Sequence, residues 1–183
     1  NLCRNRCNYC TFAKQPGSAE AHTYSIDEVE EVVRGGILTG CVEALMCLGD
    51  KPEIAYRSYR DQLAAQGMSS TTDLIVEACK VTCEKGMLPH TNAGILTREE
   101  MERLRPYNAS MGLMLETTSR RLREKGGPHF HAPDKEPATR IKMHEEAGEL
   151  KIPFTSGMLL GIGENDAERI DTIWTIGEIA RRY

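Results

Sequence analysis

The run Glu43-Ala44-Leu45-Met46-Cys47-Leu48, closed by Gly49-Asp50-Lys51-Pro52, sets the architecture expected of this chain. A short apolar run that ends in a turn with glycine and proline is typical of a β-strand inside a sheet. Its apolar residues do not alternate with polar ones, which favours a strand covered on both faces, as in parallel sheets. We therefore expect a buried strand whose carboxyl end carries the Gly49-Asp50 turn.

The same unit of strand and helix recurs along the chain. We expect further strands over 88–92, 110–116 and 153–161, and helices over about 25–37, 54–66, 72–85, 97–104, 138–150 and 165–182. Capping-box patterns mark two helix starts, with Ser25 and Glu28 in one and Thr97 and Glu100 in the other. Strands that alternate with helices predict parallel βα units, so the fold class is α/β. The expected architecture is a partial TIM-type (βα) barrel with its functional groups at the carboxyl ends of the strands.

Composition limits the classes of protein that the chain can represent. It has 183 residues, of which 40% are hydrophobic and 27% charged, enough for one domain with a buried core. The net charge of −4 comes without a basic stretch, which argues against a nucleic-acid partner. No apolar run reaches the roughly 18 residues of a membrane span and no secretory signal is present, so we expect a cytoplasmic protein without a membrane partner. The start at Asn1 and the end inside a helical pattern indicate one incomplete domain over 1–183, truncated at both ends.

Three of the seven cysteines, Cys3, Cys7 and Cys10, crowd into one loop with C-x3-C-x2-C spacing. In a reducing compartment such crowding indicates metal binding before disulfides. Three thiolates can hold three irons of a 4Fe-4S cubane and leave the fourth iron open to a ligand. The alternative is a non-catalytic zinc module with a histidine ligand, although the nearest candidate, His22, precedes a long βα domain rather than a small local fold. The remaining cysteines are expected to be buried thiols that act as small hydrophobes: Cys41, Cys47, Cys79 and Cys83.

Tyr9 stands immediately before Cys10, and with it the cysteine motif resembles the signature of the radical S-adenosylmethionine superfamily. In that family three cysteines hold a 4Fe-4S cluster, whose open iron chelates the methionine part of S-adenosylmethionine. Reduction then yields a 5'-deoxyadenosyl radical. The resemblance therefore implies Cys3, Cys7 and Cys10 as cluster ligands, with the cluster and S-adenosylmethionine as cofactors, and it leaves the catalytic side chains unknown.

Two further motifs extend the resemblance. Gly49-Asp50-Lys51-Pro52-Glu53 matches the position of the family's glycine-rich motif, whose carbonyls receive the methionine amino group. Gly157-x-Leu159-x-Gly161-x-x-Glu164 matches a family pattern near the adenine. Either stretch alone would also pass for an ordinary turn or strand glycine. The cofactor contacts that the resemblance implies here are Gly49, Asp50, Pro52 and Gly161.

The resemblance implies three more cofactor contacts, at Tyr9, Glu116 and Arg140. Tyr9 would pack against the adenine, and Glu116 would bind the methionine or ribose part from the end of an apolar strand. Arg140 would pair with the cofactor carboxylate, a task that suits the planar guanidinium. The alternatives are an ordinary loop aromatic, a solvated charge and a surface arginine. Four other side chains can contact substrate, move protons or simply be solvated: His90, His129, His131 and Asp134.

Within the superfamily, the chain resembles the family that makes 7,8-didemethyl-8-hydroxy-5-deazariboflavin, as its first subunit or as the N-terminal half of the bifunctional form. The stretches that carry this resemblance are 1–12, 43–45, 48–53, 88–90, 111–119, 133–135 and 153–157. Asn8 and Asn92-Ala93 depart from the pattern.

This resemblance implies a lyase that converts an adduct of tyrosine and 5-amino-6-ribitylaminouracil into the deazaflavin chromophore with loss of ammonia. It implies a small-molecule substrate, a partner subunit that forms the adduct, separate or fused, and a reductant such as ferredoxin or flavodoxin. The rival assignments are that adduct-forming subunit and an enzyme of the aminofutalosine or biotin-synthase type.

Overall fold

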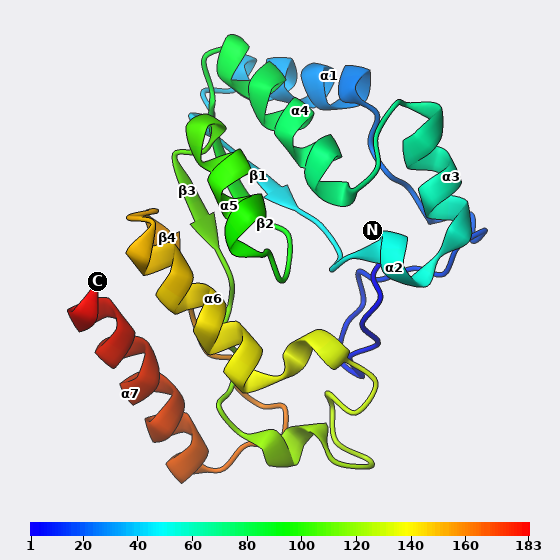
Figure 1. Ribbon diagram of the computed structural model, residues 1–183. Coiled ribbons are helices and arrows are strands. Elements are labelled where there is room, and N and C mark those ends of the chain that lie inside the picture. The colour runs from blue at the N-terminus through cyan, green and yellow to red at the C-terminus, as the bar shows by residue number, and fades with distance from the viewer.

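A computed structural model describes residues 1–183 and contains one four-stranded parallel sheet (Figure 1). The strands lie side by side in chain order: β1 (Glu43–Cys47), β2 (Leu88–Asn92), β3 (Ser110–Gly112) and β4 (Phe154–Thr155). All neighbouring pairs are parallel, with Leu45 opposite His90 and His90 opposite Ser110. The predicted α/β class with parallel βα units is confirmed.

The helices connect the strands and begin largely where their caps predict. They are α1 (Ile26–Leu38), α2 (Pro52–Ala55), α3 (Arg57–Ala65), α4 (Thr71–Glu84), α5 (Arg98–Leu104), α6 (Pro137–Glu149) and α7 (Asp166–Arg182), with short 3-10 turns at Arg105–Tyr107, Arg120–Arg123 and Pro133–Lys135. The capping boxes expected at Ser25 and Thr97 are formed, and two more are formed at Ser70 and Asn165. Each box satisfies backbone N–H groups that the first helical turn leaves free.

The single helix predicted over 54–66 is wrong, because the chain forms α2 and α3 with a break at Tyr56. Tyr56 has extended backbone angles, φ −125° and ψ 116°. Its hydroxyl donates a hydrogen bond to the Cys3 carbonyl at 3.0 Å. A contact with a distant loop, which local helical spacing does not encode, therefore accompanies the break.

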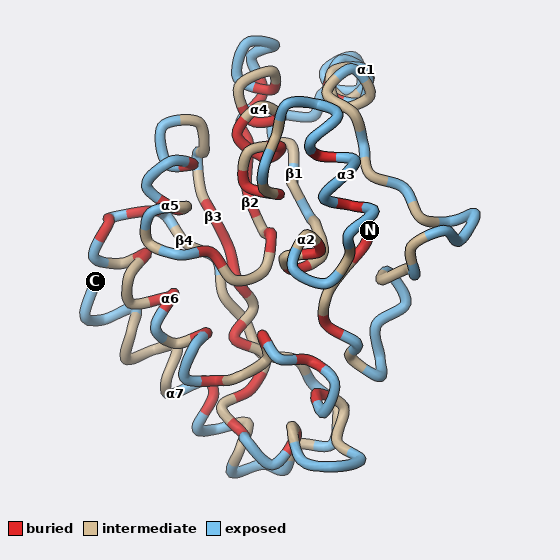
Figure 2. The backbone as a smooth tube through the Cα atoms, turned by 45° about the vertical axis from the view of Figure 1, so that its right-hand side comes forward, coloured by how far each residue is buried: buried red, intermediate tan, exposed pale blue.

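The hydrophobic core lies on one face of the sheet, beneath α4, α5 and α6. Its 13 buried residues include Cys79 from α4, Met101 from α5, Met111 from β3 and Met143 from α6. Helix α1 packs against α4 and α7 packs against α6, so the helical layer extends at both ends (Figure 1). Figure 2 shows the buried segments concentrated in α4 and the central strands.

The other face of the sheet is open next to β1. Leu45 in β1 is 57% exposed, and Leu88 in the neighbouring strand is 54% exposed. Met46 and Leu48, which alternate with Leu45, pack against the core instead. The prediction that β1 is covered on both faces is therefore wrong for this structure, because β1 is an edge strand and helices cover only one of its faces.

The third and fourth strands are shorter than predicted, since 110–116 and 153–161 are regular only within β3 and β4. Beyond them the two segments still run side by side. The Glu116 N–H donates to the Gly157 carbonyl and the Leu159 N–H donates to the Glu116 carbonyl, both at 2.9 Å. Glu116 has φ 66°, in the left-handed region, and forms an isolated parallel bridge with Met158.

All seven cysteines are free thiols. Cys79 is buried in the core, which confirms the prediction for this residue. Cys41, Cys47 and Cys83 are exposed, so the prediction that they are buried is wrong. The spacing of apolar residues around these three cysteines does not tell whether another segment packs over them, so it could not distinguish a buried thiol from an exposed one.

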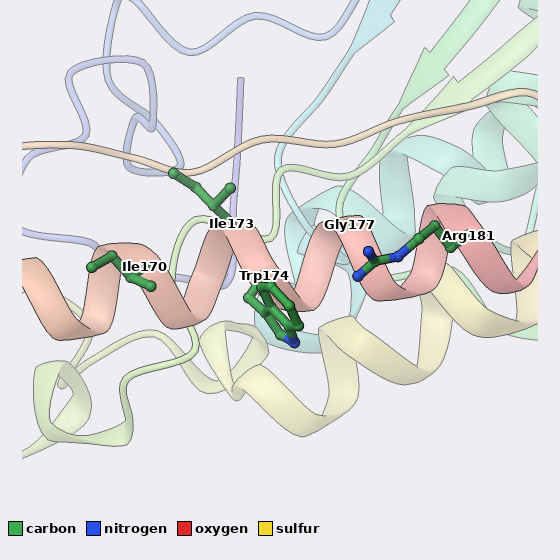
Figure 3. A pocket seen from close by; sticks show the side chains of 5 residues that line it. All are labelled: Ile170, Ile173, Trp174, Gly177 and Arg181. Carbon is green, nitrogen blue, oxygen red and sulfur yellow. The ribbon is translucent and has the colours of Figure 1, made fainter.

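Helix α7 presents an apolar stripe to the outside of the molecule. Ile170, Ile173 and Trp174 are 66%, 59% and 63% exposed. Figure 3 shows them along the helix with Gly177 and Arg181, whose guanidinium lies 5.3 Å from the centre of the Trp174 ring. This stripe contains no predicted site residue. None of the helices combines the length and the apolar composition needed to cross a membrane.

Candidate functional site

The cysteine loop is docked on the turn at the carboxyl end of β1. The Asp50 N–H and the Asn5 N–H both point at the Cys3 sulfur, at 3.2 and 3.4 Å. The Arg4 N–H donates to the Asp50 carbonyl at 3.0 Å. A Cβ at Gly49 would lie 1.9 Å from the Leu2 carbonyl oxygen and 2.7 Å from the Cys3 Cβ. Only glycine allows this approach, so the position of Gly49 in the predicted motif has a steric cause.

The loop over 125–137 closes the other side of the cysteine loop. The Arg6 N–H donates to the His131 carbonyl at 2.9 Å, and the Asn8 N–H donates to the Pro128 carbonyl at 3.0 Å. The cysteine loop is therefore held through its backbone on both sides, by segments that are far away in the sequence.

Asn5, inside the cysteine motif, joins both supporting segments. Its amide nitrogen donates to the Asp50 carboxylate at 3.4 Å, and its amide oxygen accepts from the Asp134 N–H at 3.1 Å. Arg4 forms an ion pair with the Asp134 carboxylate at 2.7 Å. Asn5 is 4% exposed, so these contacts are shielded from water. Sequence reasoning singled out Asp50 and Asp134 but missed Asn5, whose role depends on the distant partners.

The Asp50 carboxyl group is 4% exposed and only half satisfied. Its Oδ2 accepts from the Ile95 N–H at 3.2 Å, whereas its Oδ1 has no hydrogen-bond partner. Burial, with a contribution from Asp134, raises the pKa of Asp50 to about 6. Gly94, at φ 75°, makes room for this carboxyl group, because a Cβ there would lie 2.4 Å from the Asp50 Cγ. The sequence signal for Gly94, a glycine soon after the second strand, was available but was not used.

A second cluster joins Tyr9 to Glu116, which lies beyond the end of β3. The Tyr9 hydroxyl lies 3.1 Å from Glu116 Oε2 and 2.9 Å from His129 Nε2. Lys135 Nζ pairs with Glu116 Oε1 at 2.5 Å. His129 is 1% exposed, so it is not the solvated loop histidine of the alternative reading. Burial, followed by the Glu116 charge, raises the pKa of Tyr9 and keeps its hydroxyl protonated.

The structure does not bring every predicted contact to this place. Arg140 is buried inside α6, where its guanidinium donates to the Met114 and Asp134 carbonyls. Pro52 is buried at the start of α2. Gly161, at φ 85°, lies in an exposed turn that hydrogen bonds to Glu164 and not to the cysteine loop. Their roles toward a cofactor remain predictions.

The predicted histidines have different environments. His90 is 7% exposed, its Nδ1 lies 2.6 Å from the Ser110 hydroxyl, and a Cβ on Gly112 would lie 2.9 Å from its Nε2. His131 is exposed and contributes its backbone carbonyl. The buried His90 is therefore fixed by its neighbours, and His131 supports the loop without its ring.

The donor set of the loop fits a 4Fe-4S cluster. The pKa values of the Cys3 and Cys7 thiols are raised, and burial is the largest cause. The negative charge of a second cysteine in the loop adds to the shift, from Cys10 for Cys3 and from Cys3 for Cys7. No three His, Cys, Asp or Glu side chains converge closely enough to hold a single metal ion. The N–H groups aimed at the Cys3 sulfur are the kind of hydrogen bond that tunes such clusters.

Comparison with known sequences finds relatives that match the whole chain. The 7,8-didemethyl-8-hydroxy-5-deazariboflavin synthase of Methanopyrus kandleri is 46% identical over 183 residues, which are 100% of this chain and 55% of that protein. The FO synthase of Mycobacterium tuberculosis is 48% identical over 188 residues, which cover 100% of this chain and 22% of that protein. The chain thus spans about half the length of the first relative and about a fifth of the second.

Comparison with solved structures supports the fold. The crystal structure of methylornithine synthase superposes with a TM-score of 0.73 at 16% sequence identity, covering 97% of this chain and 47% of that chain. At this identity the likeness shows the fold alone. The sequence model of the radical SAM superfamily, a family of enzymes, matches residues 1–174 of this chain. Because that match covers nearly all of the 183 residues, this chain belongs to the radical S-adenosylmethionine superfamily.

Proposed function

We propose that this protein forms the deazaflavin chromophore 7,8-didemethyl-8-hydroxy-5-deazariboflavin from an adduct of tyrosine and 5-amino-6-ribitylaminouracil, with release of ammonia. The names of the relatives in Methanopyrus kandleri and Mycobacterium tuberculosis support this product, at 46% and 48% identity over the whole chain. The substrate is the one that the sequence resemblance implies. The protein would act as a lyase of the radical S-adenosylmethionine kind.

One structural observation carries the proposal: the cysteine loop is seated at the carboxyl edge of a parallel sheet, with N–H groups directed at the Cys3 sulfur. In (βα) folds this edge is where reacting groups gather. Superfamily membership implies a 4Fe-4S cluster and S-adenosylmethionine, which together supply the electron and the hydrogen-abstracting group. Cys3, Cys7 and Cys10 would hold the cluster, while the supporting segments keep the loop in place.

The other chain groups have separate tasks in this proposal. The Asp50 Oδ1, buried without a partner, can accept a hydrogen bond from a cationic group of the cofactor. Glu116 is oriented by Lys135 and by the Tyr9 hydroxyl, and can accept from hydroxyl groups of a bound cofactor. Gly49 lets the loop approach so closely that water has little space between them. These residues bind and orient, and the bond-breaking chemistry belongs to the cofactors.

The proposal includes partners that complete the reaction. A second radical enzyme, separate or fused, would supply the adduct, and a ferredoxin or flavodoxin would supply electrons. We further propose that residues 1–183 form part of a radical S-adenosylmethionine core domain. A cytoplasmic location would keep the seven free thiols reduced.

The test is anaerobic reconstitution of the full-length protein with iron and sulfide, followed by reduction in the presence of S-adenosylmethionine and the adduct. We expect 5'-deoxyadenosine and a fluorescent deazaflavin. Deoxyadenosine without deazaflavin would contradict the substrate and favour an aminofutalosine or biotin-synthase type of relative. Consumption of free tyrosine and 5-amino-6-ribitylaminouracil would instead identify the adduct-forming subunit.

Matched cysteine variants make this test specific to the loop. Cys7→Ala should lose both products and most of the iron, because it removes one of three thiolate ligands. Cys83→Ala, at an exposed thiol outside the loop, should keep both. Equal iron content in the two variants would mean that Cys7 is not a ligand of the cluster.

A further inference from the structure

The buried histidine of the 125–137 loop has no task in the proposed function so far. We propose that His129 is a positioning residue, which holds the Tyr9 hydroxyl against Glu116 and thereby fixes the Tyr9 ring between Cys7 and Cys10. The inference rests on the proposed cofactor site and adds to it a residue that none of the recognised motifs contains.

The backbone around His129 is fixed independently of its ring. The His129 N–H donates to the Leu122 carbonyl at 3.0 Å, and the Ala132 N–H donates to the His129 carbonyl at 3.0 Å. Gly127 approaches the same Leu122 carbonyl so closely that a Cβ would lie 2.4 Å from it. The loop thus presents the ring at one place, and the ring meets the edge of Tyr9 at a centroid distance of 5.6 Å and an angle of 66°.

The hydrogen-bond directions in the cluster follow from the charges. Glu116 forms an ion pair with Lys135 at 2.5 Å, and a carboxylate in such a pair can only accept hydrogen bonds. The single Tyr9 proton is therefore donated to Glu116, and the Tyr9 oxygen is left to accept from His129 Nε2. Burial lowers the pKa of His129 to about 4, so the ring is neutral and has one N–H. That N–H lies on Nε2, and the unpartnered Nδ1 carries the lone pair.

The acceptor at the far end of this chain of hydrogen bonds is itself held firmly. Glu116 has φ 66°, a conformation that a non-glycine residue adopts only when its surroundings impose it. Two backbone hydrogen bonds, from its N–H to Gly157 and from Leu159 to its carbonyl, impose it here. The Tyr9 hydroxyl therefore has two fixed partners, a carboxylate and an imidazole, which lie 3.4 Å from each other at Glu116 Oε2 and His129 Nε2.

Fixing Tyr9 fixes the loop between the second and third ligands of the cluster. Tyr9 lies next to Cys10 and two positions from Cys7, and the residue is 37% exposed. A ring held at its hydroxyl end keeps one orientation. Without the Nε2 donor, the hydroxyl loses one of its partners and the ring gains freedom to turn.

Two amide substitutions separate the hydrogen bond from simple packing. In His129→Gln the amide nitrogen can take the place of Nε2, whereas in His129→Asn it takes the place of Nδ1, so only glutamine can still donate to Tyr9. The reconstituted full-length protein and both variants are compared for iron content, thermal unfolding and affinity for S-adenosylhomocysteine, an unreactive probe of the cofactor site.

We expect equal iron in all three proteins, an affinity about tenfold weaker in His129→Asn, and recovery of most of that loss in His129→Gln, since one buried hydrogen bond contributes about a factor of ten. Equal affinities in the two variants would overturn the positioning role, because packing alone does not distinguish them. If the reconstituted wild-type protein itself failed to bind the probe, the proposed cofactor site would be wrong rather than this inference alone.

Tyr9→Phe keeps the inference testable if the asparagine variant does not fold. It retains the ring and removes only the hydroxyl, so it should weaken probe binding by about the same factor. Adding His129→Asn to Tyr9→Phe should then cost nothing further, because the two changes remove one interaction. Wild-type affinity in Tyr9→Phe, or additive losses in the double variant, would overturn the proposal.

Discussion

The 49–52 turn and the 161–164 turn both carry motifs that are predicted to contact the cofactor, at its methionine part and near its adenine, yet they are built differently. The first is pressed against the cysteine loop, and its glycine is required because another part of the chain occupies the place of a side chain. In the second turn Gly161 is exposed and is not pressed against another segment: Glu164 accepts from the Gly161 and Ile162 N–H groups at 2.8 and 2.9 Å, and a Cβ on Gly161 would meet nothing within 4 Å. The contact with a distant segment is the hydrogen bond from Arg121 to the Gly163 carbonyl at 2.7 Å. At Gly49 glycine is required because a distant segment packs against it, which indicates that several segments form a site there. At Gly161 glycine is favoured only by its positive φ, which indicates a turn.

The largest expected effect comes from Gly49→Ala. Its Cβ would overlap the Leu2 carbonyl, so the cysteine loop should leave the turn and the reconstituted protein should lose most of its iron. Iron and sulfide analysis of the purified full-length protein measures this. A Gly49→Ala protein with normal iron would show that the docked loop is not needed to hold the cluster.

Asp50→Ala should come next, with a loss of about 2 kcal/mol in the free energy of unfolding, because the Ile95 N–H and the Asn5 amide lose their acceptor. Denaturant unfolding measures it. Asp50→Asn is the matched control: both hydrogen bonds go to Oδ2, so an amide oxygen can replace it, and its NH2 can occupy the place of the unpartnered Oδ1. Equal losses in the two variants would mean that the hydrogen bonds do not stabilise the turn.

Gly161→Ala should cost only about 1 kcal/mol, the strain of a side chain at φ 85° in open space. Iron content should stay normal, in contrast to Gly49→Ala. Denaturant unfolding and iron analysis of the two alanine variants side by side give this comparison directly. A loss of iron in Gly161→Ala would show that the two turns are coupled.

The smallest effect concerns the pH dependence of the second turn. The Gly161 N–H, supported by Arg169, holds the pKa of Glu164 at about 2, below the ordinary value of 4.5. A depressed folded-state pKa contributes stability above pH 4.5 that is lost as the pH falls toward 2. Glu164→Gln should flatten the pH dependence of the thermal midpoint across this interval, with a shift smaller than that of Gly161→Ala. If the thermal midpoint of Glu164→Gln depended on pH as the wild-type midpoint does, ionised Glu164 would not stabilise the turn.

The local parts of the fold could be predicted from the sequence. The capping boxes at Ser25 and Thr97 and the apolar strand at Glu43 depend on residues a few positions apart, and the structure confirms them. The break at Tyr56 and the left-handed Glu116 depend on partners elsewhere in the chain, so periodicity did not reveal them. Helix α4 and its neighbours cover only one face of the sheet, which an apolar run cannot specify.

The candidate site divides in the same way. Cys3, Cys7 and Cys10 form a pattern within eight positions, and the sequence predicts them directly. Asn5 and Gly94 both contact Asp50, which lies more than forty positions from each in the chain, and Asn5 also bonds to the still more distant Asp134. Their types, an amide and a glycine in loops, have many ordinary explanations until the packing is known.

The sequence separation of the site contacts sets the order in which this protein can mature. The cysteine loop is synthesised before the segments that support it: Tyr9 finds Glu116 and His129 107 and 120 positions later, and Asn5 finds Asp134 129 positions later. At a translation rate of roughly 10 residues per second, the thiols wait on the order of ten seconds for their supporting loops. During that interval the nascent chain exposes three unprotected thiols, so cluster insertion is a late event in biogenesis and the emerging loop is most vulnerable to oxidation before the second half of the sheet has folded.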